Sequence, residues 1–185
     1  MKLHLGCGDI YLKDYINVDI NGKYVLQCNS DEIERNATTL DKYFKYTFGS
    51  ERRNIILDKK MDLLKKWDFA NESVDEIVMV SVIEHVSHKD AKFIVNEIQR
   101  VLKVSGKVLI DFPDLKNQFL KYYETNPEFY MELVYCNYKN EFSIHRWGYT
   151  EETFKKLFGD RFSYNFRSIV NHDYPMIGCE VTKLV

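Results

Sequence analysis

The amino-acid sequence predicts an α/β fold with parallel strands at its core. The chain begins with an apolar segment, Leu3-His4-Leu5, that runs directly into the turn Gly6-Cys7-Gly8. Further along, an apolar segment at Glu76 to Ser81 is followed by a helical pattern from Lys89 to Leu102 and by another apolar segment, Lys107 to Phe112. A strand–helix–strand unit of this kind joins parallel strands by a right-handed crossover. Ligands of such sheets bind beyond the carboxyl ends of the strands.

The Gly-x-Gly turn is the first candidate for ligand binding. Glycine lacks a Cβ, so the backbone can adopt strained dihedral angles and a ligand can approach the peptide groups closely. A second strand is predicted at Tyr15 to Ile20, with Asp19 near its tip. A carboxylate there suits a ribose, because it can accept hydrogen bonds from both sugar hydroxyl groups. Residues 6–15 give only ten positions for the crossover, so we expect at most a rudimentary helix between these strands.

The next part of the chain is a long polar insertion. It covers residues 21–53, and we expect a lid, a helical appendage or a partly disordered segment there. A further short strand is predicted at Asn54 to Leu57, where apolar residues return between charged ones.

The C-terminal part predicts helices followed by a hairpin. The segment at about 116–144 is rich in aromatic residues and is interpreted as a lid, a core segment or a dimer interface. Within it, Asn126-Pro127 has the residue types of a helix start. A last helix is predicted to begin at Thr150 and to end at Gly159. Two strands, at 162–170 and 176–184, are expected to form a terminal hairpin against the sheet.

Composition restricts the class of protein. At 185 residues the chain fits one domain, and its 45% hydrophobic residues exclude a disordered chain. The 26 basic and 28 acidic residues nearly balance, so we expect no basic face and no nucleic-acid partner. Residues 1–9 lack the apolar run of a secretory signal, and the stretch from Ile77 to Ile83 is too short to cross a bilayer. The sequence therefore predicts a cytoplasmic protein without a membrane partner.

The cysteines do not predict a metal site. They have none of the paired short spacings that build zinc sites or redox motifs, so reduced thiols are expected at Cys7, Cys28, Cys136 and Cys179. Histidine and acidic residues show no converging pattern along the sequence either. We therefore expect no metal ligands in this chain.

Several blocks of sequence, in their order and spacing, point to one family. They follow the glycine turn as Asp62-Leu63, Trp67 to Ile77, Val82 to His85, and Arg100 to Gly106. Together they resemble class I S-adenosylmethionine-dependent methyltransferases, particularly the compact type 11 group. The similarity extends to Phe112-Pro113-Asp114 and to residues 145–150, so it covers most of the chain outside 21–53. This resemblance implies a single domain over 1–185, with a doubly wound, mostly parallel sheet, helices on both faces and an antiparallel C-terminal strand.

The resemblance also implies a set of site residues around S-adenosylmethionine. Gly6, Cys7 and Gly8 would pass beneath the methionine part of the cofactor, and His4 stands where the family usually has an acid. The ribose would be held by Asp19 with Ile20, the adenine would meet Asp62 and Leu63, and Ser81 would begin the segment that faces the sulfonium. His85 and His145 are the candidates for a catalytic base, because histidine can accept a proton near neutral pH.

The function predicted from this resemblance is methyl transfer to a small molecule. A sugar or surface-glycan precursor is the expected acceptor, with oxygen as the target atom, and a homodimer is one expectation for the aromatic segment. One alternative is a non-catalytic cofactor-binding or protein-interaction domain, which His4 and the short first crossover would suit. Another is an NAD-dependent oxidoreductase, which fits poorly because its fingerprint requires glycine at Tyr11.

Overall fold

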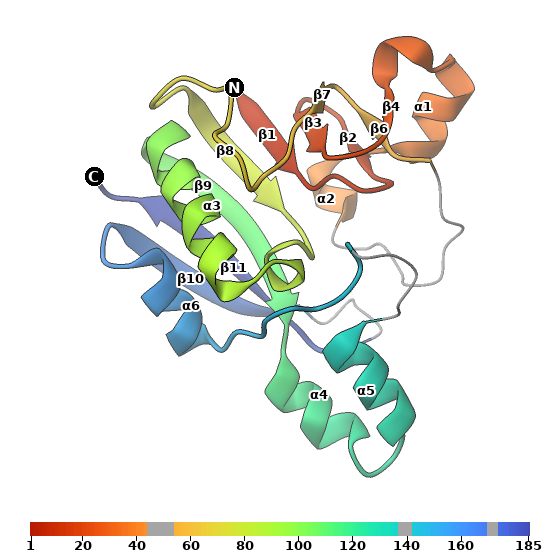
Figure 1. The fold of residues 1–185 in the computed structure, drawn as a ribbon, viewed down its shortest axis with the longest axis vertical. Helices are drawn as coiled ribbons and strands as arrows, with labels where there is room; N and C mark the ends of the chain where they lie inside the picture. The colour runs from red at the N-terminus through yellow and green to blue at the C-terminus, as the bar shows by residue number, and fades with distance from the viewer. Residues whose placement is uncertain (44–53, 137–141, 170–173) are drawn as a thin grey trace.

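The computed structural model describes residues 1–43, 54–136, 142–169 and 174–185, and it is built around a seven-stranded sheet (Figure 1). The strand order is β10-β11-β9-β8-β1-β3-β7. Its five consecutive strands from β9 to β7 pair in parallel, whereas β11 is antiparallel to both β9 and β10. The strands are β1 (Lys2–Leu5), β3 (Ile16–Asp19), β7 (Lys59–Lys60), β8 (Val74–Met79), β9 (Leu102–Pro113), β10 (Phe162–Ile169) and β11 (Met176–Lys183). This is the predicted fold class, including the terminal hairpin.

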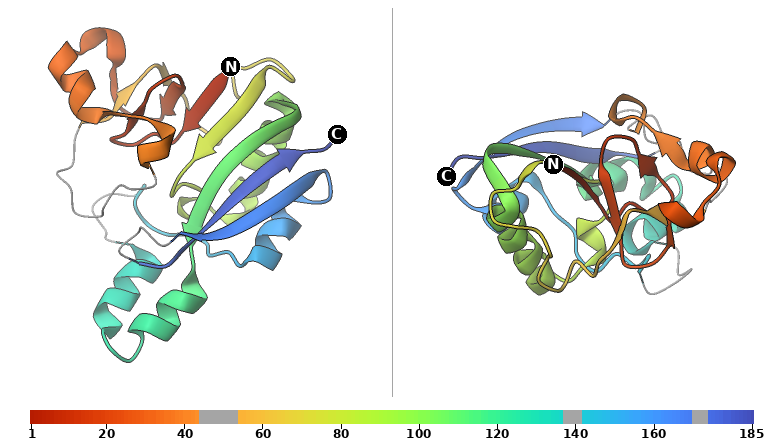
Figure 2. Two further views of the ribbon diagram at one scale, coloured as in Figure 1. Left: turned by 180° about the vertical axis from the view of Figure 1, so that it is seen from behind. Right: turned by 90° about the horizontal axis from the view of Figure 1, so that it is seen from above.

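The two helices α3 (His88–Val101) and α6 (Glu151–Phe158) pack on the same face of the sheet (Figures 1 and 2). The Ser87 hydroxyl caps α3, and Thr150 and Gly159 bound α6 as the sequence predicts. The core beneath these helices contains alternate strand residues such as Ile77 and Met79. Because side chains alternate along a strand, their neighbour Val78 faces the opposite side.

A smaller cluster covers that opposite face. Val78 packs there with Ile10, Leu12, Tyr15 and Tyr43. Tyr43 belongs to the short helix α2 (Leu40–Tyr43), so helices lie on both faces, although among the described residues the long ones, α3 and α6, share one face. The crossover from β1 to β3 contains only β2 (Tyr11–Leu12) and no helix, as the short spacing predicts.

The described part of the insertion forms small elements beside the β1–β3–β7 edge (Figure 1). They are β4 (Lys23–Tyr24), η1 (Val25–Gln27), α1 (Ser30–Asn36), β5 (Ala37–Thr38) and α2. The strand β5 pairs with β2. Residues 44–53 of the predicted insertion lie outside the described part of the chain.

One predicted strand takes a different place from the one expected. Ile56–Leu57, named β6, pairs with β4 in a separate small sheet, and Lys59–Lys60 supplies the edge strand of the main sheet. The apolar side chains of β6 are buried, which explains why the sequence pattern pointed to that segment. The main sheet uses only the backbone of the two lysines, and their charged side chains give no strand signal.

The aromatic segment begins with two helices that extend away from the sheet (Figure 1). They are α4 (Leu115–Tyr122), capped by Asp114, and α5 (Pro127–Tyr135), capped by Asn126. Residues 137–141 of this segment are not among those described. No helix in the described ranges is both long and apolar enough to span a membrane.

Candidate functional site

The glycine turn lies at the carboxyl end of β1, where the two glycines on either side of Cys7 have left-handed backbone angles. Gly6 has φ of 63° and Gly8 has φ of 53°. A Cβ on Gly6 would lie 2.6 Å from Cγ2 of Val82, so this residue is glycine because the segment after β8 packs directly against it. A Cβ on Gly8 would meet no protein atom within 4 Å. Gly8 therefore presents bare backbone to open space.

Asp19 ends β3 and is bonded to the glycine turn. Its Oδ2 accepts a hydrogen bond from the backbone N–H of Gly8 at 2.9 Å, and its Oδ1 accepts one from the N–H of Ile20 at 2.7 Å. The backbone carbonyl of Asp19 accepts from the N–H of Met61 at 2.9 Å, which draws the segment after β7 to the same edge. Oδ1 of Asp19 also accepts from the N–H of Asn21 at 3.3 Å, so the lone pair that remains belongs to Oδ2. The open space over Gly8 and the part-buried carboxylate beside it fit a ribose-bearing cofactor such as the expected one.

The Asp62 side chain is engaged mainly by its own turn. Oδ1 accepts from the N–H of Leu64 at 2.9 Å, and Oδ2 lies 3.4 Å from Nζ of the exposed Lys65. The carbonyl of Leu63 accepts from Nε1 of Trp67 at 3.1 Å. The structure thus brings Asp62 and Leu63 to the expected edge while giving Asp62 the ordinary role of a turn cap as well.

Cys7 and His4 are turned into the protein. Burial raises the pKa of the Cys7 thiol, so a ligand over the turn would meet the backbone of Cys7 and no thiolate. The His4 ring is fully buried, with Nδ1 at 3.0 Å from Oδ1 of Asn17 and Nε2 at 3.0 Å from the hydroxyl of Tyr43. Both ring nitrogens are therefore used to join β1, β3 and α2, and His4 is not available to a cofactor.

Ser81 follows β8 and is tied to the neighbouring strand. It has φ of 51°, and its N–H donates to Oδ1 of Asp111 on β9 at 2.6 Å. Asp111 is fully buried, and burial raises its pKa to about 7. Its Oδ2 has no hydrogen-bond partner among the described residues. Within the described part of the chain, the hydrogen bond to the Asp111 carboxyl group therefore comes from the backbone N–H of Ser81 alone.

Glu84 lies in the 3₁₀ turn η2 (Ile83–His85) and is also buried. Burial, together with the nearby Asp111, raises its pKa well above the ordinary range. Its Oε2 and the hydroxyl of the buried Tyr149 are polar atoms without a partner in the described ranges. The backbone carbonyl of Glu84 accepts from the N–H groups of Arg146 and Trp147 at 2.7 and 3.2 Å, which fixes the segment that carries His145.

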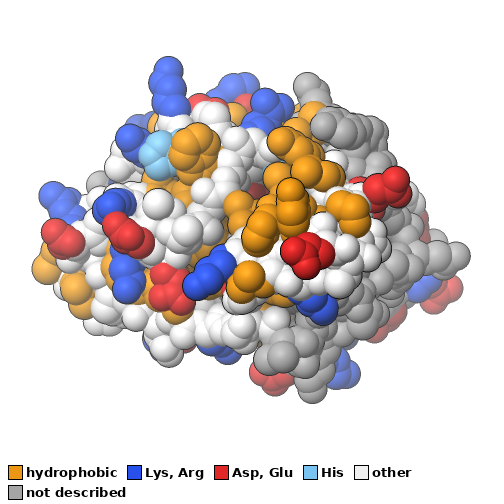
Figure 3. Space-filling model, turned by 90° about the horizontal axis from the view of Figure 1, so that it is seen from below, with side chains coloured by type: hydrophobic (Ala, Val, Ile, Leu, Met, Phe, Trp, Pro, Cys, Tyr) orange, Lys and Arg blue, Asp and Glu red, His pale blue; other side chains and the backbone are white. Residues whose placement is uncertain are grey.

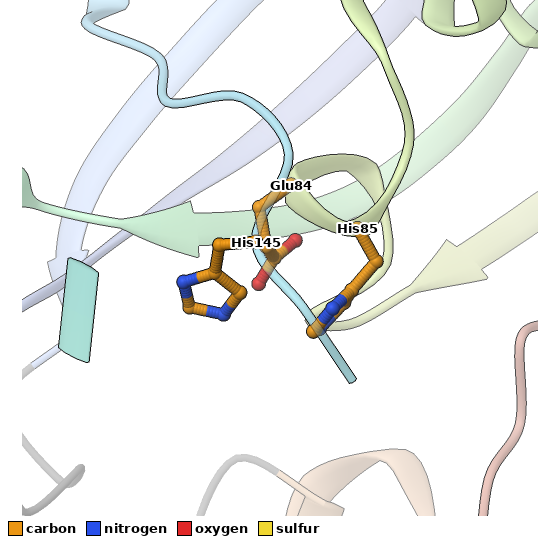
Figure 4. A group of neighbouring side chains, drawn as sticks. All are labelled: Glu84, His85 and His145. Carbon is orange, nitrogen blue, oxygen red and sulfur yellow. The ribbon is translucent and has the colours of Figure 1, made fainter. Parts of the chain in front are cut away.

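The two candidate bases, His85 and His145, come together beside Glu84 (Figure 4). Their ring centroids are 4.8 Å apart, although the residues belong to distant parts of the sequence. Burial and then the neighbouring His145 lower the pKa of His85 to about 4, and burial lowers that of His145. Both rings are therefore neutral at pH 7. Nδ1 of His85 lies 3.3 Å from the carbonyl oxygen of Ile144.

Sequence reasoning missed three polar residues at this edge. Asp58 accepts from the N–H of Asn17 at 2.7 Å and from the hydroxyl of Tyr11 at 2.9 Å, which braces the β1–β3 crossover. Asp111 and Tyr149 supply the unpartnered polar atoms described above. An acid in the otherwise apolar strand from 107 to 112 was the available signal for Asp111, whereas nothing in the sequence placed Tyr149 near Glu84.

Comparisons with known proteins show the family and the fold of this chain. Residues 3–110 match a family model described as a methyltransferase domain. No curated protein matches the sequence. Solved structures that resemble the fold include a SAM-dependent methyltransferase from Methanosarcina mazei, with 18% identity, a TM-score of 0.58, and coverage of 100% of this chain and 92% of that one.

Two further solved structures share the fold at low sequence identity. The YcgJ protein from Bacillus subtilis is 14% identical with a TM-score of 0.56, and the alignment covers 100% of this chain and 92% of that one. Magnesium protoporphyrin IX methyltransferase from Synechocystis, solved with bound SAH, is 14% identical with a TM-score of 0.55, covering 99% and 73%.

Proposed function

The chain belongs to the methyltransferase domain family, with S-adenosylmethionine as its methyl donor, and we propose that it methylates an oxygen atom of a small molecule such as a sugar or glycan precursor. The observation that carries the proposal is the contact between two groups of residues. Val82, next to the Glu84–His85 turn, packs directly on Gly6 of the glycine turn. The expected cofactor side and the histidine pair are therefore neighbours along one edge of the sheet.

The cofactor side consists of backbone groups and one carboxylate. S-adenosylmethionine supplies an activated methyl group on a sulfonium sulfur, so little acid–base assistance is needed for the leaving group. The residues proposed to bind it are Gly6, Cys7, Gly8, Asp19, Ile20, Asp62, Leu63 and Ser81. In this proposal the bare backbone at Gly8 allows the close approach of the cofactor, and Asp19 accepts a hydrogen bond from the ribose through the remaining lone pair of Oδ2.

The acceptor side favours a hydroxylated compound. A hydroxyl nucleophile must lose its proton when it is methylated, and a neutral histidine is in the correct state to accept it. His85 and His145 are both neutral and partly accessible, so we propose that they contact the acceptor. A pKa near 4 makes His85 a weak base, which favours positioning of the hydroxyl over full proton abstraction.

Calorimetry tests this proposal together with the two alternatives. S-adenosylhomocysteine at a hundred times its dissociation constant should add about 2.7 kcal/mol to the free energy of unfolding. Stabilisation by NAD alone would contradict the proposal and favour an oxidoreductase. If S-adenosylhomocysteine binds, labelled S-adenosylmethionine should transfer its methyl group to members of a panel of sugars and nucleotide sugars. Binding without transfer to any hydroxylated acceptor would favour the non-catalytic alternative.

The helical hairpin of α4 and α5 is the proposed interface of the predicted homodimer. Large hydrophobic side chains are exposed there, and such side chains gather on the lower face of the molecule (Figure 3). The exposed ones on these two helices and directly after α4 are Phe119, Leu120, Tyr123, Met131 and Tyr135. Contiguous apolar surface of this kind is typical of interaction sites. The homodimer stays a prediction, and light scattering of the full chain measures it.

A further inference from the structure

The side chains of Glu84, His85 and His145 form a cluster that could hold a metal ion. One ligand atom from each of Glu84, His85 and His145 lies within 4.8 Å of the others. Figure 4 shows the three side chains extending to the same side of the turn and of the facing segment. Glu84 and His85 come from η2, and His145 comes from the segment after the α4–α5 hairpin. The cluster was not expected, because the ligands converge only through the tertiary fold.

Two of the three side chains have a ligand atom that forms no hydrogen bond with the described residues. The carbonyl of Ile144 can only accept, so Nδ1 of His85 carries the proton and Nε2 keeps a free lone pair. The ring of His145 is hydrogen-bonded to the backbone of Leu133 and of Val134. Oε2 of Glu84 is buried without a partner among the described residues. Histidines that ligate metals are characteristically held by such a bond from the second ring nitrogen.

The separations are close to those of a bound ion. Zinc lies about 2.0–2.2 Å from imidazole nitrogen and carboxylate oxygen, which places neighbouring ligands about 3–3.5 Å apart. Contraction from 4.8 Å requires side-chain shifts of only about 1 Å. We propose that Glu84, His85 and His145 bind one divalent transition-metal ion, with open coordination positions on the side of the expected acceptor.

The ligand set selects the class of ion. Two imidazole groups with one carboxylate suit Zn²⁺, Fe²⁺ or Co²⁺, whereas Mg²⁺ and Ca²⁺ prefer sites made only of oxygen atoms. Three protein ligands leave positions for water or for acceptor oxygen atoms, as in catalytic metal sites. This use of the ion rests on the proposed function, in which it would orient the acceptor hydroxyl. Metal binding itself does not depend on the identity of the acceptor.

Equilibrium dialysis of the full chain, without an affinity tag, against Zn²⁺ and against Co²⁺ tests the site. The wild-type protein should bind one metal ion per chain. Glu84→Gln, His85→Asn and His145→Asn should each weaken binding by at least about 100-fold, because each removes a ligand. The thermal midpoint should rise with Zn²⁺ in the wild type but not in these three variants, since an ion that binds the folded state stabilises it. Circular dichroism without metal shows whether each variant is folded.

Two controls separate this cluster from other zinc-binding groups. His88 lies three residues after His85, packs against Trp147 and is outside the cluster. The His88→Asn variant should therefore still bind one metal ion per chain. The double variant Cys28→Ser with Cys136→Ser removes the two cysteines that are not buried, and it should also still bind one metal ion per chain. Loss of binding in either control, persistence of binding in folded cluster variants, or no bound equivalent in the wild type would overturn the proposal. Calorimetry with S-adenosylhomocysteine on the same samples reports the proposed function separately.

Discussion

Two parts of the same sheet edge satisfy their buried polar groups in opposite ways. On the glycine side, at the ends of β1 and β3, Asp19 accepts from backbone N–H groups and His4 uses both ring nitrogens. On the histidine side, at the ends of β8 and β9, polar atoms of Glu84, Asp111 and Tyr149 have no partner in the described ranges. A buried polar atom without a partner costs about 1–3 kcal/mol. The side chains of Asp19 and His4 on the glycine side are thus hydrogen-bonded within the protein, whereas the histidine side leaves buried polar atoms unpaired among the described residues, at a cost in stability.

The largest expected effect is an increase in the free energy of unfolding when Asp111, on the histidine side, is replaced by asparagine. The pKa of Asp111 is raised from 3.8 to about 7, so stability is lost as the pH rises between these two values. Asp111→Asn keeps an oxygen for the N–H of Ser81 and removes the ionisation. In the presence of a chelator we expect the free energy of unfolding at pH 8 to rise by about 4 kcal/mol, as measured by urea denaturation.

A matched substitution on the glycine side should have the opposite sign. Asp19→Asn replaces one oxygen that accepts a backbone N–H by an amide group that cannot accept, so we expect a loss of about 1–2 kcal/mol. Near pH 4 the gain from Asp111→Asn should nearly vanish, because the wild-type carboxyl is then protonated in the folded state. Destabilisation by both substitutions at pH 8 would mean that the two sides do not differ.

The second prediction concerns ligand binding over Gly8. A Cβ there meets no protein atom, so Gly8→Ala should reduce the affinity for S-adenosylhomocysteine by about 100-fold, or about 2.7 kcal/mol, only if the cofactor occupies that space. Gly159→Ala is the control, because Gly159 has φ of 80° with equally open surroundings at the end of α6. Calorimetry should show intact binding in the control. Equal affinities for both variants would place the cofactor elsewhere.

The third prediction tests Asp19 as the ribose ligand. Asp19→Ala should weaken binding of S-adenosylhomocysteine by about 1–3 kcal/mol, as expected for a lost charge-assisted hydrogen bond. Asp62→Ala provides the comparison, and its effect should be smaller, because the Asp62 side chain already caps its own turn. Isothermal titration of both variants gives the difference. An unchanged affinity for Asp19→Ala would remove this residue from the site.

The glycine turn and the strand that ends at Asp19 could be predicted from the sequence because they are close together along the chain, whereas the cofactor-binding role of these residues stays a prediction. Gly8 and Asp19 lie eleven residues apart, and both follow short apolar strands that pair in parallel. Helix boundaries were predictable for the same reason. The side chains of Asn126 and Thr150 cap α5 and α6 through N–H groups three residues further along.

The histidine side could not be predicted because its contacts join distant segments. Ser81 and Asp111 are 30 residues apart, and His85 is 59 residues from the Ile144 carbonyl that holds its ring. Each residue type was visible in the sequence, but nothing local indicated that Glu84 would lie between two histidines. The edge strand β7 escaped prediction for a related reason, since only the backbone of Lys59 and Lys60 takes part in pairing.

The smallest expected effect comes from His4, a buried titratable group on the paired side. Burial lowers its pKa from 6.5 to about 4, so between these values the unfolded chain binds a proton that the folded chain excludes. Stability is therefore unaffected above pH 6.5 and is lost as the pH falls toward 4. From pH 7.5 to 5.5 this single residue should reduce the free energy of unfolding by about 1.3 kcal/mol. Urea titrations of wild type and of His4→Gln, which cannot titrate, isolate that contribution from those of other groups. An identical pH dependence in both proteins would show that His4 is protonated as readily when folded as when unfolded, and that burial does not hold it neutral.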